Sequence, residues 1–182
     1  FSWIWENTLN YTKRSGDHNL NILAGISAQE NNFGTSWINT HDLHETVPTT
    51  NAGNIIDAAG NTKTSNSLVS NFARLNYDFA SKYLLSAAFR YDGSSKLASG
   101  DKWDFFPAFT AGWRISSESF MQNVDAINDL KIRASWGQNG NQEGISDYTS
   151  FGLSSFSRVP PTNPLSGPAV KPYSIANPDL TW

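Results

Sequence analysis

The segment RLNYDFASKYLLSAAFRYD, residues 74–92, decides the fold that this sequence predicts. On either side of residues 80–82, every second side chain is apolar or aromatic, and the side chains between them are mostly polar. A period of two is typical of a β-strand with one apolar and one polar face. A connection of three residues between two such strands predicts a tight turn, and therefore an antiparallel hairpin.

The same alternation predicts six strands, near residues 3–12, 19–29, 69–79, 83–92, 105–115 and 130–136. Most of these runs have about 10 residues, whereas strands of globular proteins usually have about 5 or 6. A strand of about 10 residues tilted by about 45° crosses the hydrocarbon core of a bilayer. The predicted fold class is therefore all-β: an antiparallel transmembrane β-barrel segment with about 6–7 long strands.

The predicted connections alternate between short and long. Short turns are expected at 14–18 and 80–82, and long polar loops at 30–67 and 137–177. Residues 93–102 make a medium loop, and one short helical turn is expected around 118–124. Because outer-membrane barrels combine short periplasmic turns with long extracellular loops, the alternation favours a barrel over a soluble sandwich.

The apolar faces of the strands are predicted to contact lipid. The residues expected there are Trp3, Trp5, Leu9, Tyr11, Leu20, Ile22, Tyr83, Leu85, Phe89, Phe109, Trp113, Ile132 and Trp136. With the short turns in the periplasm, the inner rim holds Tyr11, Tyr77, Tyr83 and Trp113, and the outer rim holds Trp3, Trp5, Phe89, Tyr91, Phe105 and Trp136. Trp and Tyr favour the headgroup level because an apolar ring carries a polar edge.

The opposite faces of the strands carry charge. Their charged residues are Arg74, Asp78, Arg90, Asp92, Arg114, Lys131 and Arg133. On a soluble sheet these side chains face solvent, and in a barrel they line the lumen. An Arg or Lys at the bilayer midplane costs about 2–4 kcal/mol, so a barrel must turn this face inward.

The composition excludes several classes of protein. The chain has no cysteine, and therefore no disulfide, thiol chemistry or zinc–thiolate site. A formal net charge of −3 and a pI near 5.5 leave no basic surface for nucleic acid. No apolar run approaches the about 20 residues of a transmembrane helix. Aromatic residues make up 13% of the chain, which fits a barrel wall but also a carbohydrate-binding β-sandwich.

Both ends of the chain fall within strand-like patterns, at residues 1–5 and 179–182. We therefore expect residues 1–182 to be part of a barrel domain from a longer protein, with the signal peptide and any preceding domain outside this sequence.

Patterns for catalysis and for metal binding are weak. His41 and His44 are three residues apart with Glu45 nearby, but no third ligand position is fixed, so we predict no metal site. No phosphate-binding loop and no nucleophile elbow occur in the sequence. We predict that the protein is not an enzyme and that it binds no cofactor.

Ligand contact is expected on the extracellular loops. The candidates are Trp37, Trp103, Asn139, Asn141 and Gln142. An exposed indole can stack on a sugar ring, and side-chain amides can bond to sugar hydroxyls. The commoner role of such residues is to pack the loops or to face a protein partner.

Four stretches resemble the SusC/RagA family of TonB-linked outer-membrane proteins. They are RLNYDFASKYLLSAAFRYDGSSKL (74–97), WDFFPAFTAGWRIS (103–116), LKIRASWGQNGNQ (130–142) and NPDLTW (177–182), and WENTL (5–9) belongs with them. Their order and spacing are similar to that family's barrel throughout the 182 residues.

The resemblance implies a 22-stranded barrel that is filled by an N-terminal plug and imports nutrients with energy relayed through TonB. It also implies a SusD-like surface lipoprotein as partner, oligosaccharide or peptide as cargo, and a place in the outer membrane of a Gram-negative bacterium. The plug, the TonB-contacting segment and the signal peptide are not in this sequence. Two alternatives stay open from the residues alone: a passive porin-like channel and a soluble carbohydrate-binding β-sandwich.

Overall fold

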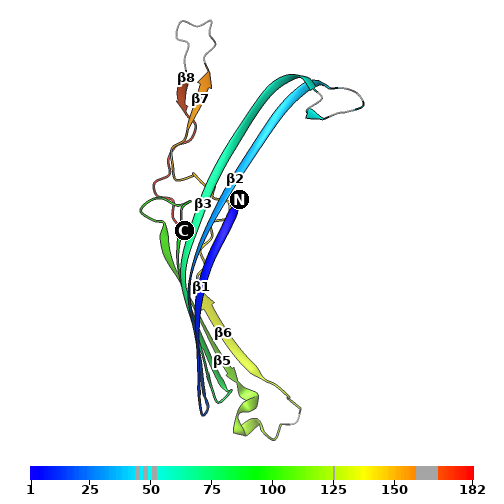
Figure 1. Ribbon diagram of the computed structural model, residues 1–182. Coiled ribbons are helices and arrows are strands. Elements are labelled where there is room, and N and C mark those ends of the chain that lie inside the picture. The colour runs from blue at the N-terminus through cyan, green and yellow to red at the C-terminus, as the bar shows by residue number, and fades with distance from the viewer. Residues whose placement is uncertain (44–45, 47–48, 51–52, 125, 159–167) are drawn as a thin grey trace.

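The computed structural model describes residues 1–43, 46, 49–50, 53–124, 126–158 and 168–182. Within these residues, one sheet contains six antiparallel strands in sequence order (Figure 1). The strands are β1 (Ser2–Ser15), β2 (His18–Leu43), β3 (Gly53–Phe79), β4 (Tyr83–Ser94), β5 (Trp103–Arg114) and β6 (Lys131–Gly137). The sheet is curved and open, as a section of a barrel wall is. Four of the six predicted strands lie within β1–β4, and the predicted strands at 105–115 and 130–136 match β5 and β6 except for one residue each.

Two tight turns fix the register of the first four strands. Gly16, with φ +56°, lies between β1 and β2, where Ser15 pairs with His18. Between β3 and β4, Ala80 and Ser81 both have positive φ, and the Lys82 amide donates to the Phe79 carbonyl at 3.0 Å. Positive φ at both central residues matches the right-handed twist of the strands, although neither residue is glycine. We call the edge of the sheet that holds these turns the short-turn end.

The predicted long loop at 30–67 is wrong, because most of it continues the β2–β3 ladder. The two strands have 26 and 27 residues and stay paired from His18↔Phe79 as far as Leu43↔Gly53, with one irregularity at Asn39/Thr40. At roughly 3.4 Å per residue, β2 is about 85 Å long. Figure 1 shows this two-stranded ribbon extending well beyond β1 and β4. Its two faces are mixed, because polar residues such as Thr35 and Thr62 alternate with exposed apolar ones such as Phe33, Trp37 and Ile38.

The other connections carry short elements. Residues 115–121 form two 3₁₀ turns, η2 (Ile115–Ser117) and η3 (Ser119–Met121), where one helical turn was predicted. The predicted loop 137–177 contains a separate hairpin of β7 (Ser154–Arg158) and β8 (Pro168–Pro172). Among the described residues, no helix is long and apolar enough to cross a membrane.

Little of the described chain is buried. The buried apolar side chains are Leu97, Ala98 and Phe106. They lie at the edge opposite the short turns, where the Ala98 amide donates to the Leu180 carbonyl and the Trp182 indole donates to the Lys102 carbonyl, both at 3.0 Å. Elsewhere both faces of the sheet are open. No second sheet covers the apolar face among the described residues, as a sandwich would require.

Candidate functional site

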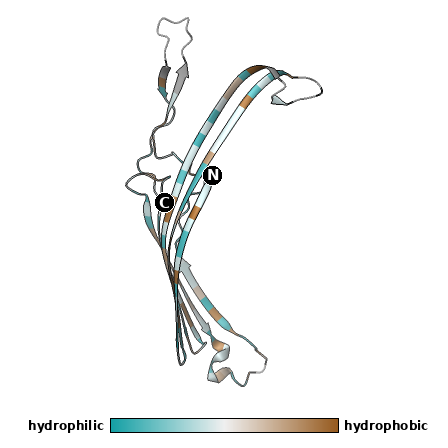
Figure 2. Cartoon of the chain, in the orientation of Figure 1, coloured by the Kyte–Doolittle hydropathy of each residue, from teal (hydrophilic) through white to brown (hydrophobic). Residues whose placement is uncertain are grey.

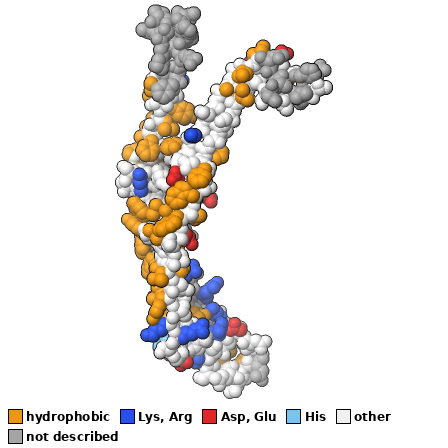
Figure 3. Space-filling view, viewed as in Figure 1, with side chains coloured by type: hydrophobic (Ala, Val, Ile, Leu, Met, Phe, Trp, Pro, Cys, Tyr) orange, Lys and Arg blue, Asp and Glu red, His pale blue; other side chains and the backbone are white. Residues whose placement is uncertain are grey.

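The register places all the residues predicted to face lipid on one face of the sheet, which we call the apolar face. Directly opposed residues of an antiparallel pair project to the same face. Tyr11 on β1 opposes Ile22 on β2, and Trp113 on β5 opposes both Tyr83 and Ile132. Figure 2 shows hydrophobic and hydrophilic bands succeeding one another along the strands, and Figure 3 shows apolar side chains over the sheet.

The apolar face carries charge only near its ends. Lys13 lies near the short turns and opposes Leu20, and Glu30 lies near the other end and opposes Trp3. Between these two rows, the strand residues on this face are uncharged. The large side chains there are well exposed, with Leu9 at 74% and Phe109 at 45%.

A carboxylate orders the aromatic rim at the short-turn end. Glu118, between η2 and η3, accepts hydrogen bonds from the Tyr83 hydroxyl at 2.8 Å and the Trp113 indole at 3.1 Å. It also pairs with the Lys82 ammonium at 3.0 Å. Lys82, and then the two ring donors, lower the pKa of the Glu118 carboxyl to about 2. The polar edges of two rim aromatics therefore have a partner. Glu118 was not among the residues predicted from the sequence, because only the fold brings Lys82, Tyr83 and Trp113 to its carboxylate.

The opposite face, which we call the polar face, is organised in rows across the strands. One row is uncharged and reads Thr12, Asn21, Asn76, Ser86, Thr110 and Ser135 from β1 to β6. Within it, Asn21 donates to Thr12 at 2.9 Å, and Ser86 donates to Asn76 at 2.9 Å. The next row toward the short turns reads Arg14, Asn19, Asp78, Leu84, Gly112 and Arg133.

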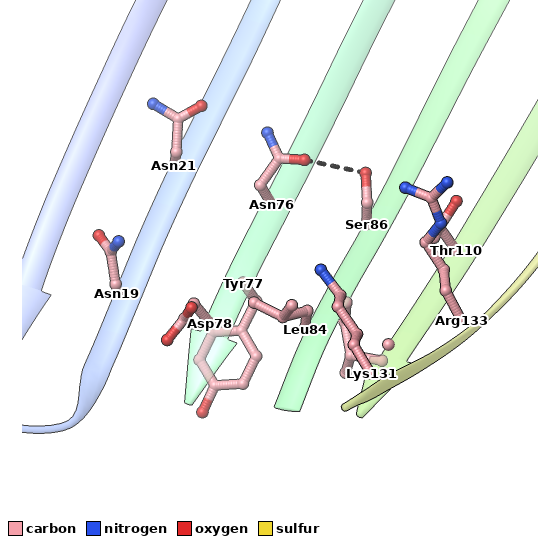
Figure 4. A pocket seen from close by; sticks show the side chains of 12 residues that line it. Asn19, Asn21, Asn76, Tyr77, Asp78, Leu84, Ser86, Thr110, Lys131 and Arg133 are labelled. Carbon is pink, nitrogen blue, oxygen red and sulfur yellow. Dashed lines mark hydrogen bonds between the residues drawn. The ribbon is translucent and has the colours of Figure 1, made fainter. Parts of the chain in front are cut away.

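Most residues of these two rows, together with Tyr77, Leu85 and Lys131, line a hollow that we call the lower pocket (Figure 4). Gly112 leaves its floor open, and the Lys131 side chain crosses over that glycine, with Cε 3.4 Å from where a Cβ would lie. Lys131 and Arg133 make no hydrogen bond or ion pair with the described residues. The lower pocket thus combines neutral hydrogen-bonding groups and apolar side chains with two cations and one carboxylate, that of Asp78.

A second hollow, the mouth pocket, lies at the opposite end of the polar face. Arg90 bonds to Asp92 at 3.1 Å and to Ser70 at 3.1 Å. Phe106 and Trp182 meet edge to face, with ring centroids 5.2 Å apart. The residues that line the pocket are Leu68, Arg90, Asp92, Phe106, Asn139, Gly140, Gln142 and Trp182.

The structure brings together two of the five predicted ligand residues. Asn139 and Gln142 both line the mouth pocket, and Gln142 accepts a hydrogen bond from Ser94 at 2.6 Å. Asn141 does not line it, and its side-chain oxygen accepts from the Glu143 amide at 2.8 Å. Phe106 and Trp182 were not predicted as pocket residues, because only the folded chain places them beside Asn139.

The two candidate tryptophans lie on strands and not on loops, which corrects that part of the prediction. Trp37 lies within β2 opposite Gly60, and a Cβ on that glycine would lie 2.7 Å from the indole. Trp103 begins β5 opposite Gly93, where the corresponding distance is 2.5 Å, and its ring stacks on Tyr91 at 5.1 Å. Each indole therefore covers the backbone of a cross-strand glycine. Trp37 stands on the long ribbon and Trp103 on the apolar face, both apart from the mouth pocket.

The histidine pattern at 41–44 lies only partly within the described residues, since His44 and Glu45 fall outside them. His41 bonds to Asp57 on the opposite strand at 2.7 Å. Among the described residues, no three His, Cys, Asp or Glu side chains are grouped to hold a metal ion.

Comparison with known proteins identifies the family. A family model described as "TonB dependent receptor-like, beta-barrel" matches residues 3–182. TonB-dependent receptor P26 of Formosa agariphila is 35% identical over 190 residues, covering 99% of this chain and 18% of that protein. TonB-dependent receptor SusC of Bacteroides thetaiotaomicron is 40% identical over 90 residues, covering 50% of this chain and 9% of that protein.

Solved structures agree in fold. The structure described as the RagAB peptide transporter superposes on the whole chain with a TM-score of 0.86 at 21% identity, and the match covers 20% of that chain. This chain therefore spans about a fifth of the length of relatives such as P26 and of the RagAB chain. From the family match, the identity to its relatives and the shared fold, the chain belongs to the TonB-dependent receptor family, as a β-barrel segment of the SusC/RagA type.

Proposed function

We propose that residues 1–182 form part of the barrel domain of an outer-membrane nutrient importer in a Gram-negative bacterium. The apolar face contacts lipid, and the polar face lines the transport lumen. One observation carries this proposal: a single register across six strands gathers the charged side chains on the polar face. On the apolar face, the charged strand residues lie near its two ends, at Lys13 and Glu30, or on the long ribbon, at Lys63.

The dimensions of the apolar face support its contact with lipid. Tyr83 and Tyr91 lie on the same strand, eight residues apart, which is about 27 Å at roughly 3.4 Å per residue. With a tilt of about 40°, the height along the membrane normal is about 21 Å, close to the ~25 Å apolar band of outer-membrane barrels. The ring hydroxyls would then lie near the two headgroup levels.

The whole protein, in this proposal, is a transporter and not an enzyme. Its cargo is an oligosaccharide or a peptide, its energy comes through the TonB complex, and a SusD-like lipoprotein covers its mouth. Membership of a family of TonB-dependent receptors supports active import over a passive pore. The mouth pocket supports a role in cargo capture, because it joins an ion pair, two amides and two aromatic rings.

The test uses the full-length protein in the bacterium that makes it. Uptake of fluorescent oligosaccharides and of fluorescent peptides is measured in the parent strain, in a strain without TonB, and in one without the adjacent surface lipoprotein. We expect uptake of one cargo class to require the receptor and to be lost without TonB. Uptake that requires the receptor but continues unchanged without TonB would identify a passive channel and reject the proposal.

A further inference from the structure

We propose that the apolar face binds the headgroup of an anionic phospholipid beside the β1–β2 turn. The residues that bind it form the rim cluster, which we define as Lys13, His18, Tyr77 and Phe79. This inference rests on the proposed function, in which the apolar face contacts lipid, and it names the kind of lipid that one place on that face prefers. Because the rim cluster then lies on the outside of the barrel wall, neither the lumen nor a plug inside it borders the cluster.

The strand register brings the members of the rim cluster together on one face. Lys13 on β1 opposes Leu20, which is two residues from His18 on β2. Lys13 and His18 are therefore diagonal neighbours, and His18 directly opposes Phe79 on β3. Diagonal neighbours on one face lie about 7–8 Å apart, which is within reach of a long side chain. One small anionic group can thus contact both Lys13 and His18.

Two contacts hold the exposed ring of His18 in place. Its Nδ1 atom lies 2.7 Å from the Tyr77 hydroxyl, and its ring centroid lies 4.8 Å from that of Phe79. When the Tyr77 hydroxyl donates to Nδ1, the hydrogen of the neutral ring lies on Nε2, and a protonated ring carries a hydrogen on Nε2 as well. His18 therefore offers an N–H donor to a phosphate oxygen in both protonation states.

The rim cluster lies at the level that the proposed function assigns to lipid headgroups. Tyr77 is one of the aromatic residues predicted for the inner rim, and His18 contacts its hydroxyl directly. Lys13 is two residues closer to the turn than Tyr11, another of these aromatics on the same strand. Since Tyr and Trp mark the boundary between hydrocarbon and headgroups, the ammonium and the N–H donor lie where lipid phosphates lie.

Charge complementarity favours an anionic headgroup over a zwitterionic one. Phosphatidylcholine brings a cation of its own next to Lys13, whereas phosphatidylglycerol brings only a phosphate and hydroxyls. Basic side chains near a membrane surface attract anionic lipids for this reason. Of the other charged residues at this turn, Arg14 projects to the polar face and Asp17 lies in the turn itself. Lys13 is therefore the charged residue of β1 and β2 that a lipid meets at this end of the apolar face.

The same rim has different chemistry on β4 and β5. There the Tyr83 hydroxyl and the Trp113 indole donate to Glu118 at 2.8 and 3.1 Å. Glu118 also pairs with Lys82 at 3.0 Å, so this cation is neutralised by its partner. An ion pair without net charge does not attract an anionic lipid as Lys13 does. The wall near β5 is therefore an internal control for the wall near β2.

The test measures which lipid lies beside each part of the apolar face. The full-length receptor carries a single cysteine, I22C or A111C, that is labelled with bimane, and it is reconstituted in phosphatidylcholine vesicles. Ile22 lies one row from Lys13 on the neighbouring strand, and Ala111 lies on β5. Quenching is compared between phosphatidylglycerol and phosphatidylcholine that carry a nitroxide near the headgroup end of one acyl chain, at equal mole fraction. The ratio of the two quenching constants at each position cancels the depth of the label.

At position 22 we expect phosphatidylglycerol to quench about three- to fivefold more strongly than phosphatidylcholine, the scale of attraction between one lysine and an anionic surface. At position 111 the two lipids should quench equally. K13Q should lower the ratio at position 22 to that at position 111. H18F keeps the ring on Phe79 but loses the N–H donor, so it should about halve the ratio. K63Q removes a cation of the same face on the long ribbon and should leave the ratio unchanged.

Several results would overturn the assignment. Equal quenching by the two lipids at position 22, or the same ratio at positions 22 and 111, rejects the rim cluster as a lipid site. An unchanged ratio in K13Q shows that another group attracts the lipid. If K13Q does not assemble, K13M replaces it, because methionine keeps an apolar stem against lipid. Loss of the preference on addition of inorganic phosphate, but not of chloride at the same ionic strength, assigns the cluster to free phosphate.

Failure of this inference is distinguishable from failure of the proposed function. If neither lipid quenches at either position, the apolar face does not contact lipid, and the proposed function is rejected. If both lipids quench strongly and equally at both positions, the apolar face contacts lipid, and the rim cluster alone is rejected.

Discussion

Leu84 and Leu85 are neighbours on β4 that project to opposite faces, so the same substitution at each should have opposite consequences. Leu85 opposes Tyr77 and Ala111 on the apolar face, and Leu84 lies on the polar face opposite Asp78 and Gly112. Leu85→Arg should therefore place a guanidinium in lipid. Leu84→Arg should place it in the lumen, within reach of the Asp78 row.

The expected loss of stability depends on how deep each residue lies in the membrane. Leu85 is two residues inside the rim residue Tyr83, and Ala87 is four residues inside, midway between Tyr83 and Tyr91. An Arg costs about 2–4 kcal/mol at the midplane and about 0–1 near the interface. We therefore expect about 1–3 kcal/mol of destabilisation for Leu85→Arg and about 2–4 for Ala87→Arg, with Leu84→Arg below about 1.

The assay is guanidinium unfolding of the full-length protein in lipid vesicles, with heat-modifiable gel migration as the readout of assembly. Leu84→Arg serves as the matched control, because it introduces the same side chain one residue away. Equal destabilisation by Leu84→Arg and Leu85→Arg would refute the facing assignment. So would a Leu85→Arg protein that assembles as stably as the wild type.

Three further outcomes are expected from local contacts. Glu118→Gln should lower the unfolding midpoint in denaturant at neutral pH. The pKa of Glu118 is lowered to about 2 in the folded protein, so its stabilising effect is complete above about pH 4.5. The difference from the wild type should therefore shrink as the pH falls from 4.5 to 2. A pH-independent difference would show that the ion pair is not its cause. Ser81→Gly should stabilise the β3–β4 turn by about 1 kcal/mol, because Ser81 has φ 55°; a loss of stability in the same denaturant titration would contradict the turn geometry. Gly93→Ala should destabilise the protein by about 1–3 kcal/mol and change Trp103 fluorescence, since the new Cβ would lie 2.5 Å from the indole. Gly100→Ala, where no atom lies within 4 Å of the new Cβ, should be neutral. Equal effects of the two substitutions would reject the packing of Trp103 on Gly93.

The strands and their faces were predictable from sequence because each membrane-spanning segment alternates chemically. Along β4, Leu85, Ala87 and Phe89 define one face without knowledge of any partner strand. The same rule failed for the outer half of the β2–β3 hairpin. Residues such as Thr35, Ser36, Thr62 and Thr64 are polar on both faces, so a paired ribbon and a polar loop have similar sequences there.

The site was only partly predictable, because its contacts depend on register. Asn139 and Gln142 were recognised as amides on a loop, and the fold brings them to one pocket with Phe106. Trp103 was interpreted as an exposed loop side chain, since nothing in the sequence tells that Gly93 lies directly opposite. The partners of Glu118 come from two strands and a turn, and no spacing in the sequence joins them.

The central claim, that the apolar face contacts lipid and the polar face contacts water, is tested most directly by nitroxide scanning along β4. Residues 1–182 contain no cysteine, so single cysteines at positions 84–89 can be spin-labelled in the full-length receptor once any cysteine outside this segment is replaced. Accessibility to oxygen and to a water-soluble nickel complex is then measured in vesicles. We expect accessibility to alternate with a period of two, with oxygen contact dominant at 85, 87 and 89 and nickel contact dominant at 84, 86 and 88. Accessibility without that period, or nickel contact dominant at 85 and 87, would contradict it.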